Sequence, residues 1–212
     1  MMKLAEMTVS AFVDMVASDA PAPGGGSVAA LEGSIGAALT AMVACLTQGR
    51  NKYAEYAEYA AEVEKKGNDL KARLLDVMDR DTEAFNVVSD AFGMAKDTDE
   101  QKAARGAAIQ SALKGCTKTP TETMELCSEA ITLTASLLTH GFNDTSASDL
   151  GVALLSLKAG MQGAWLNVLI NIGSIKDSTF VTEYRTRGSA LLAHALPLAD
   201  ESYAKIVALI DD

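Results

Sequence analysis

Two long segments with almost no charged residues constrain the fold of this chain more than any other feature. The first runs from Ser27 to about Gln48 and the second from about Leu150 to Ile172. A helix that is apolar on nearly every side belongs in the middle of a bundle or at a subunit interface. Small residues recur along the first segment at spacings of three and four, which would let a neighbouring helix approach closely: Ala30, Gly33, Ala37, Ala41 and Ala44. We expect two central helices and oligomerisation, because one bundle of this size would struggle to cover both.

The rest of the chain shows helical rather than strand periodicity. Thr8 is expected to cap a short helix, and a charged amphipathic segment spans residues 53–94, with a kink expected near Gly67-Asn68. Further helices are expected over residues 100–116, from Thr119-Pro120-Thr121 to His140, and from Asp177 or Thr179 onward, with a break or bend at Pro197. The sequence predicts one all-α domain, residues 1–212, built as a helical bundle with long buried helices.

The composition argues against several classes of function. Eighteen basic and 28 acidic residues give a net charge of −10, which repels nucleic acids and anionic membranes. Three scattered cysteines and two isolated histidines have no metal-ligand spacing and no nucleophile signature, so the thiols are expected to be reduced and mostly buried, in a cytoplasmic protein. Residues 1–18 have helical periodicity rather than the pattern of a signal peptide, and the longest apolar runs are interrupted, so no membrane span is expected.

A glycine-rich loop, Ala22-Pro23-Gly24-Gly25-Gly26-Ser27, lies directly before the first uncharged helix. Consecutive glycines are costly to order and are kept where the backbone must make an unusual turn or a close approach. Pro23 would fix the entry to the loop and Ser27 could cap the helix. Free amide groups at a helix start form a seat for an anion or a polar ligand. The alternative interpretation is a flexible linker.

A second polar loop precedes the other uncharged helix. It holds the short polar side chains of Asn143, Ser146, Ser148 and Asp149, whose simplest role is helix capping. If the two uncharged helices pack in parallel, both of their N-termini converge on one cleft. Their dipoles and free amides would then favour a polar or anionic ligand.

Single polar residues add to this hypothesis. Asn167 and Asn171 lie one turn apart on an apolar helix, where they must bind either a ligand or a neighbouring backbone. Asp81 lies in a charged segment and could be an ordinary solvated residue. Arg50 and Lys52 follow the first uncharged helix, where they could receive an anionic substrate or simply point into water.

In their order along the chain, these segments resemble the cyclodeaminase/cyclohydrolase family of folate enzymes. That family includes the C-terminal half of formiminotransferase-cyclodeaminase and the stand-alone bacterial methenyltetrahydrofolate cyclohydrolases. The matching segments are residues 22–31, Leu46-Thr47 with Gly49-Arg50 and Lys52-Tyr53, Asp81 with Ala84-Phe85, Asn143 with residues 148–153, and residues 164–168 with Asn171. The resemblance covers nearly the whole chain, without the formiminotransferase half, although Asp144 and Thr145 are less typical.

The resemblance implies an all-helical homodimer that acts on a tetrahydrofolate one-carbon derivative in the cytoplasm, with no metal or redox cofactor. Cyclohydrolase chemistry opens 5,10-methenyltetrahydrofolate to 10-formyltetrahydrofolate. Cyclodeaminase chemistry closes 5-formiminotetrahydrofolate and releases ammonia. Both pass through a tetrahedral carbon between N5 and N10 and need proton transfer there. The preferred hypothesis is a cyclohydrolase, and the alternative is a cyclodeaminase. A hypothesis from another class is a non-catalytic helical dimer that binds a ligand or scaffolds a complex.

The resemblance also implies roles for individual residues. The proton-transfer carboxylate is Asp81 or Asp149, which a raised pKa would suit to neutral pH. The remaining expected contacts are with the substrate, through backbone, hydroxyl, amide and basic groups: Gly24, Gly25, Gly26, Ser27, Asn143, Ser148, Asn171, Arg50 and Lys52. The two basic residues would attract the glutamate tail of the folate.

Overall fold

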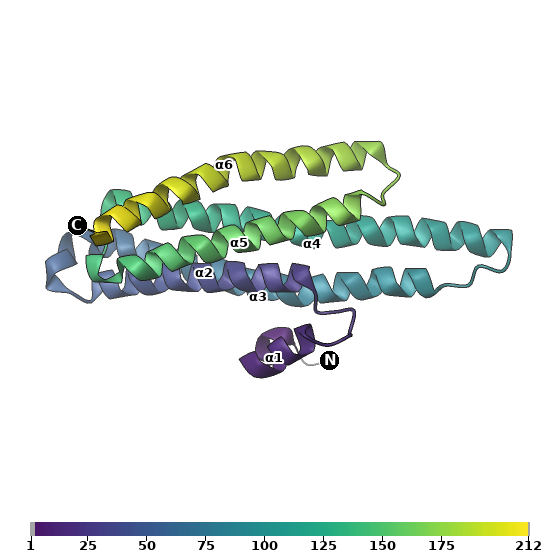
Figure 1. The fold of residues 1–212 in the computed structure, drawn as a ribbon, viewed down its shortest axis with the longest axis horizontal. Helices are drawn as coiled ribbons and strands as arrows, with labels where there is room; N and C mark the ends of the chain where they lie inside the picture. The colour runs from purple at the N-terminus through teal and green to yellow at the C-terminus, as the bar shows by residue number, and fades with distance from the viewer. Residues whose placement is uncertain (1–2, 212) are drawn as a thin grey trace.

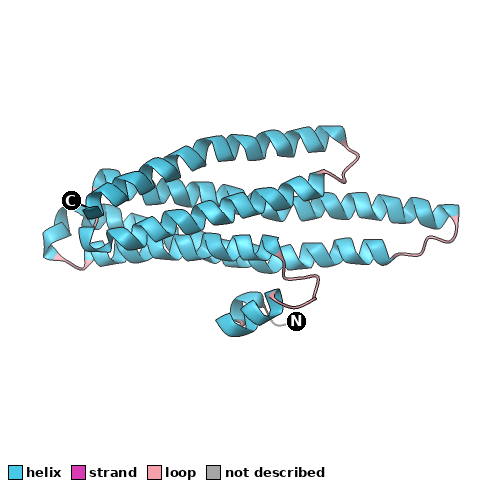
Figure 2. Ribbon diagram, viewed as in Figure 1, coloured by secondary structure: helices cyan, strands magenta, loops and turns pink. Residues whose placement is uncertain are grey.

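The two uncharged segments form α2 (Gly25–Gln48) and α5 (Ala147–Ile172), which pack directly against each other. The computed structural model describes residues 3–211, which contain α-helices and short 3-10 helices and no strand (Figure 2). The other elements are η1 (Leu4–Glu6), α1 (Val9–Val16), η2 (Asn51–Tyr56), α3 (Ala57–Gly93), α4 (Asp99–His140), η3 (Asp144–Ser146) and α6 (Ser178–Asp211). The all-α bundle predicted from the sequence is confirmed over this range.

The long helices α2 to α6 lie lengthwise beside one another, and α1 lies outside them near the start of α2 (Figure 1). Short connections reverse the chain between successive long helices, so the three reversals from α2 to α5 leave these two helices antiparallel. Gly25 at the start of α2 therefore lies beside Asn167 near the end of α5, while Thr47 bonds to Asn143 at the opposite end. The expected parallel arrangement of the two helices is wrong.

Small residues set the spacing between the helices, as the sequence predicts. A Cβ atom on Gly36 would lie 2.5 Å from Leu157 Cγ, and one on Gly160 would lie 2.6 Å from the Ala29 carbonyl oxygen. Gly67 lies within the continuous helix α3, where a Cβ atom would come within 3.2 Å of the α2 backbone. This glycine allows α3 to approach α2 closely. Helix packing therefore accounts for a glycine at this position, where the sequence analysis expected a kink.

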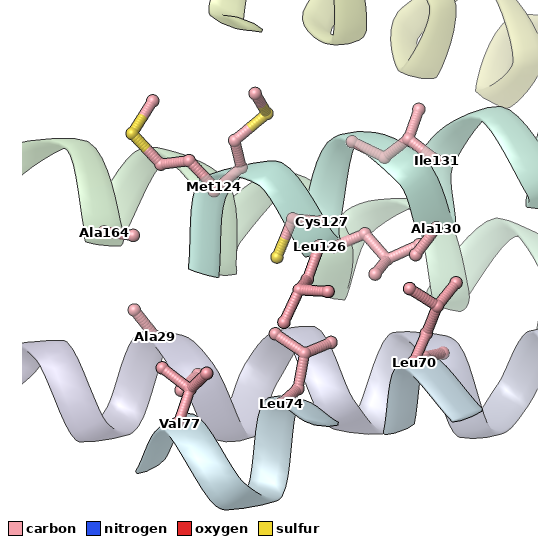
Figure 3. Close-up of a cluster of buried hydrophobic side chains, with 14 of the residues drawn as sticks. Ala29, Leu70, Leu74, Val77, Met124, Leu126, Cys127, Ala130, Ile131 and Ala164 are labelled. Atoms are coloured by element: carbon pink, nitrogen blue, oxygen red, sulfur yellow. The ribbon is translucent and has the colours of Figure 1, made fainter. Parts of the chain in front are cut away.

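The hydrophobic core lies between α2, α3, α4 and α5. Figure 3 shows side chains of these helices meeting in one layer. The members with no more than 1% of their surface exposed include Ala29, Leu70, Leu74, Val77, Met124, Leu126, Cys127, Ala130, Ile131 and Ala164. The three cysteines are free thiols; Cys116 and Cys127 are buried and Cys45 is exposed.

Two helices were predicted on either side of Pro120, but α4 is one continuous helix and Pro120 lies inside it. Proline has no N–H group, so the carbonyl of Cys116 loses its partner within the helix. The Asn171 side chain of α5 replaces that partner by donating from Nδ2 to the Cys116 oxygen at 3.0 Å. Pro197 likewise lies within α6, which bends along its length without a break (Figure 1).

The expected helix caps are half right. Thr8 caps α1 by accepting a hydrogen bond from the Ala11 amide at 3.2 Å. Helix α2 begins one residue after Gly24, its N-cap residue, so Ser27 lies inside the first turn and does not cap it.

By length and composition alone, α2 and the segment Asp144–Ile172 could each cross a membrane, which the interrupted runs of sequence did not predict. In the bundle, 56% and 39% of their most apolar windows are buried.

Candidate active site at the glycine end of the bundle

A cavity of about 320 Å³ lies where the start of α2 meets α3, α4 and the end of α5. We refer to it as the Asp81 cavity. Its lining combines glycines, an acid, a thiol and two amides with a few apolar groups: Pro21, Ala22, Gly24, Gly25, Gly26, Asp81, Thr82, Phe85, Cys116, Asn167, Ile170 and Asn171. The structure therefore brings together the glycine loop, Asp81 and Asn171, which the sequence singled out separately.

Asp81 projects from α3 and is partly buried. Ser27 donates from Oγ to Asp81 Oδ2 at 3.0 Å, and Thr119 donates from Oγ1 to Oδ1 at 3.2 Å. Burial raises the pKa of Asp81 above its ordinary value, although the hydrogen bonds from Ser27 and Thr119 oppose that rise. The carboxyl group is thus held in place while its ionised form is disfavoured. This environment is unlike that of a solvated surface residue and suits proton transfer.

The glycines allow the start of α2 to approach this carboxylate. A Cβ atom on Gly26 would lie 2.5 Å from Asp81 Oδ2, so no larger residue fits without moving the acid. The backbone amide of Ser27 also donates to Asp81, which places the carboxylate itself at the positive end of the α2 dipole. Ser27 is fully buried, so its hydroxyl positions Asp81 from behind the cavity wall.

Two asparagines of α5 form the opposite wall. Asn167 donates from Nδ2 to the Gly163 carbonyl at 2.9 Å, and Asn171 donates to the Cys116 carbonyl. Each amide group thus makes a backbone hydrogen bond, which was the structural interpretation of these residues. The Oδ1 atom and the second N–H of each amide remain to bind a polar ligand.

Cys116 lines the cavity but is unsuited to act as a nucleophile. Burial, together with the nearby charge of Asp81, raises the pKa of its thiol to about 11. The thiolate is the reactive form of cysteine, and at neutral pH this side chain is a neutral thiol. Among the groups that line the cavity, the carboxyl of Asp81 is therefore the one suited to acid–base chemistry.

The other predicted site residues lie at the far end of the bundle. Along α5, 18 residues separate Asp149 from Asn167, which corresponds to about 27 Å of helix. Arg50, Lys52, Asn143 and Ser148 belong to the same distant end. Within one chain, the two polar loops therefore do not share a cleft, contrary to the expectation, because α2 and α5 are antiparallel.

Asn143 is buried and binds its own surroundings. Its backbone N–H donates to Thr47 Oγ1 at 2.9 Å, and its Oδ1 accepts from Thr145 Oγ1 at 2.7 Å. Nearby, Lys52 donates to Asp144 Oδ2 at 2.9 Å, and the Tyr53 hydroxyl also donates to Asp144. These bonds attach the loop to the end of α2.

Sequence reasoning gave no role to several groups around Asp81. Thr82 Oγ1 lies 3.1 Å from Ser27 Oγ, and Thr119 bonds to the acid from α4. Cys116 and Phe85 complete the wall, and Phe85 was named only as part of a segment that matches the family. Thr82 and Phe85 could have been found from their spacing to Asp81 on one helix. Thr119 and Cys116 depend on the register of α4 against α3, for which the sequence offers no signal.

The bundle and its cavity define a class of protein: an all-helical bundle with a small, partly polar cavity, at which a partly buried carboxyl group is suited to proton transfer. The chain belongs to the formiminotransferase-cyclodeaminase family, whose model matches residues 8–190.

Known relatives agree with this assignment. The chain is 41% identical over 199 residues to the methenyltetrahydrofolate cyclohydrolase of Methylorubrum extorquens, covering 94% of this chain and 95% of that protein. It is 35% identical over 184 residues to the formimidoyltransferase-cyclodeaminase of Sus scrofa, of which it covers 34%. The crystal structure of formiminotetrahydrofolate cyclodeaminase from Thermotoga maritima matches 97% of this chain and 96% of its own, with a TM-score of 0.82 and 25% identity.

Proposed function

We propose that this chain is a methenyltetrahydrofolate cyclohydrolase, which adds water to the methenyl carbon of 5,10-methenyltetrahydrofolate and produces 10-formyltetrahydrofolate. The observation that carries this choice is the end-to-end similarity to the cyclohydrolase of Methylorubrum extorquens. The geometry of the Asp81 cavity supports it, because hydration of this carbon needs a base and an acid but no group transfer to the protein.

Asp81 is the proposed proton-transfer group. In its ionised form it accepts a proton from the attacking water as the oxygen bonds to the carbon between N5 and N10. The bond from that carbon to N5 then breaks, N5 takes a proton, and the remaining hydroxyl becomes the formyl oxygen, so that one proton is released overall. A raised pKa favours both halves of this exchange near neutral pH.

The other groups of the cavity bind and orient. Ser27 and Thr119 fix the Asp81 carboxylate through their hydroxyl groups. The amide groups of Asn167 and Asn171 and the backbone of the glycine loop provide hydrogen bonds for the pterin edge. The proposed reaction requires no metal or redox cofactor, and this remains a prediction.

The second candidate is a formiminotetrahydrofolate cyclodeaminase. The structural likeness to the Thermotoga maritima enzyme favours it. This reaction forms the same tetrahedral carbon, from which ammonia departs instead of water being added, and it would use the same carboxylate.

A paired assay of the purified protein separates the candidates. Loss of methenyltetrahydrofolate absorbance beyond the uncatalysed rate, without ammonia release from 5-formiminotetrahydrofolate, is the result expected for the cyclohydrolase. Ammonia release with little hydration would favour the cyclodeaminase. No turnover of either compound would contradict both and leave the non-catalytic ligand-binding dimer.

We also infer that the chain forms one domain, acts as a homodimer and works in the cytoplasm. The free state of the three cysteines supports the last of these. The apolar surface of α2 and α5 supports the homodimer.

A further inference from the structure

The side chain of Thr82 lines the Asp81 cavity and directly follows the proposed acid on α3. Its Oγ1 atom lies 3.1 Å from Ser27 Oγ, which in turn lies 3.0 Å from Asp81 Oδ2. Neighbouring residues of a helix project about 100° apart, so Asp81 and Thr82 need a group from another helix to link them. Ser27, at the start of α2, is that group. The three side chains thus form one continuous series of hydrogen bonds from the acid to a second point on the cavity wall.

The hydroxyl group of Thr82 bonds differently from most other threonine hydroxyls in the bundle. A threonine inside a helix commonly bonds to the backbone carbonyl one turn earlier. Seven threonines of α2 and α4 do so: Thr40, Thr47, Thr117, Thr121, Thr123, Thr132 and Thr134. Among the residues that the structure describes, the Thr82 hydroxyl has only Ser27 Oγ as a partner. A hydroxyl has one donor and two acceptor sites, so Thr82 can also bond to a ligand in the cavity.

The middle of this series is closed to solvent. Ser27 is 0% exposed, whereas Thr82 is only partly buried where it meets the cavity. The glycine before Ser27 holds the start of α2 against the acid, since a Cβ atom on Gly26 would lie 2.5 Å from Asp81 Oδ2. A proton that moves along the series would therefore pass between the acid and the cavity without exchange with bulk water.

The proposed reaction moves protons at two places on the substrate. The attacking water loses a proton at the methenyl carbon, and N5 gains a proton as its bond to that carbon breaks. Both oxygens of Asp81 are held in place, because Thr119 donates to Oδ1 and Ser27 donates to Oδ2. The carboxyl group is therefore not free to turn from one place to the other. A second donor on the cavity wall would remove the need for that movement.

We propose that the hydroxyl groups of Ser27 and Thr82 form a proton relay between Asp81 and N5 of the substrate, and that Thr82 is the catalytic residue that donates to N5. This inference rests on the proposed function, which supplies the identity of the substrate atom. It gives Ser27 a second role besides holding the carboxyl group, and it gives Thr82 a role in the reaction.

The relay works by reversing the direction of its hydrogen bonds. While Asp81 is ionised, Thr82 donates to Ser27 and Ser27 donates to Asp81. Once Asp81 has taken a proton from the attacking water, it donates to Ser27, Ser27 donates to Thr82, and Thr82 donates to N5. As the bond from the carbon to N5 breaks, its electron pair takes the proton of Thr82, each hydroxyl is refilled from its neighbour, and Asp81 is ionised again. Asp81 then takes the proton of the hydroxyl that becomes the formyl oxygen and releases it to solvent.

Two substitutions of Thr82 separate its hydroxyl from its shape. Thr82→Val removes the hydroxyl, and we expect kcat to fall about 10- to 100-fold, less than for loss of the acid itself. Thr82→Ser keeps the hydroxyl and should restore most of kcat. Thr117→Val is the matched control, because it removes a buried hydroxyl that bonds to the carbonyl of Leu113 in its own helix, and it should leave kcat unchanged. Wild-type kcat in Thr82→Val would overturn the proposal.

A double variant tests whether the two hydroxyl groups act in series. Ser27→Ala should lower kcat more than Thr82→Val does, because it breaks the relay and also removes a donor from Asp81. Adding Thr82→Val to Ser27→Ala should then cause little further loss, since the relay is already broken. Two hydroxyls with separate structural roles would instead give losses that multiply, and that result would overturn the relay.

The solvent isotope effect distinguishes proton delivery from a structural role of Thr82. Without the relay, delivery of a proton to N5 limits turnover in Thr82→Val. We therefore expect the ratio of kcat in H₂O to kcat in D₂O to be larger for Thr82→Val than for the wild type, and to return to the wild-type ratio in Thr82→Ser. A lowered kcat in Thr82→Val with an unchanged ratio would show that the hydroxyl only positions Asp81, and it would overturn the proposal.

Denaturant unfolding tests the bond between the two hydroxyl groups without any assay of activity. The proteins compared are the wild type, Ser27→Ala, Thr82→Val and the double variant. Each single variant breaks the same hydrogen bond, so the double variant should lose less stability than the sum of the two single losses. Additive losses would overturn the relay, whatever the enzymatic activity is. A wild-type protein that turns over neither folate, in a set whose losses are not additive, would contradict the proposed function alone.

Discussion

At the glycine end of the α2/α5 pair, polar side chains surround one carboxylate beside a cavity, whereas at the Asn143 end they bind to the loop that contains them. Asp81 receives hydrogen bonds from α2 and α4 and lies against open space. Asn143, by contrast, bonds to Thr47, Leu46 and Thr145 and is 1% exposed. The same kinds of short polar residue thus surround a cavity at one end, the proposed active site, and attach a loop at the other.

The two ends also shift the pKa of a carboxyl group in opposite directions. Burial raises the pKa of Asp81, while hydrogen bonds from Tyr53 and Lys52 lower the pKa of Asp144. When neighbouring donors favour the ionised form of a carboxyl group, its ionisation stabilises the fold. When burial disfavours the ionised form, the group keeps its proton to a higher pH. The difference supports the proposal that proton transfer takes place at the glycine end.

The largest expected effect comes from removing the carboxylate of Asp81. Asp81→Asn should lower kcat for methenyltetrahydrofolate by about 10²- to 10⁴-fold, the range for loss of a general acid or base. The substrate KM should change little, since the amide keeps the size and most hydrogen bonds of the acid. Steady-state kinetics on protein shown by circular dichroism to be folded checks this prediction.

Asp149→Asn is the matched change at the other end of α5. Asp149 is partly exposed in the first turn of that helix, and we expect kcat to stay within about threefold of the wild type. If Asp149→Asn proved as damaging as Asp81→Asn, the reaction would need a second acid in addition to Asp81. If only Asp149→Asn were damaging, Asp81 would have been assigned wrongly.

The next effect concerns the close approach of α2 to the acid. Gly26→Ala forces Asp81 to move, because the new Cβ would lie 2.5 Å from Oδ2. A displacement of about 1 Å at a catalytic group can lower kcat about 100-fold. Gly49→Ala, at the other end of α2, meets no atom within 4 Å and should leave kcat unchanged. Equal kinetics for the two alanine variants would remove the steric argument for the glycine loop.

Much of the fold could be predicted from the sequence because the signals are local. The uncharged segments, the small residues at spacings of three and four, and the Thr8 cap each depend on neighbouring residues, and they led to the correct helices. Pro120 misled the prediction of α4, since a local rule for proline ends a helix there. The side chain that replaces the lost hydrogen bond, Asn171, lies 51 residues further along the chain.

The site was half predictable for a related reason. Residue type and family resemblance were enough to name Asp81, the glycine loop and Asn171 as candidates. The sequence does not show which of the candidates lie close together in the fold. The direction of α5 relative to α2 decides that question, and it follows from the number of chain reversals between the two helices. Thr119 reaches Asp81 only because of the register of α4, which many core contacts set together.

Asn171 offers a smaller effect that separates structure from ligand binding. Asn171→Leu leaves the Cys116 carbonyl with only the long hydrogen bond from Thr119 Oγ1, at 3.5 Å, and should lower the free energy of unfolding by about 1 kcal/mol. Pro120→Ala restores a backbone N–H within α4, so the double variant should recover most of that loss. Denaturant unfolding of the four proteins measures the coupling. Recovery of stability without recovery of KM would show that the amide also binds substrate. Additive losses would contradict the proposed link between Pro120 and Asn171.

The smallest effect is the response of stability to pH, where Asp81 and Asp144 should differ in sign. Because the pKa of Asp81 is raised in the folded state, its ionisation destabilises the fold as the pH rises through that pKa. Asp81→Asn should therefore be more stable than the wild type near pH 7, with a difference that disappears in acid.

The pKa of Asp144 is lowered, so its stabilising effect is present near neutral pH and is lost as the pH falls through the folded-state pKa. Asp144→Asn should be less stable than the wild type near pH 7 and equal to it in acid. Thermal unfolding between about pH 7 and about pH 3, at one fixed protein concentration, checks both curves. If both variants were more stable than the wild type near pH 7, or both less stable, the two carboxyl groups would not have pKa shifts of opposite direction. The electrostatic argument for proton transfer by Asp81 would then fail.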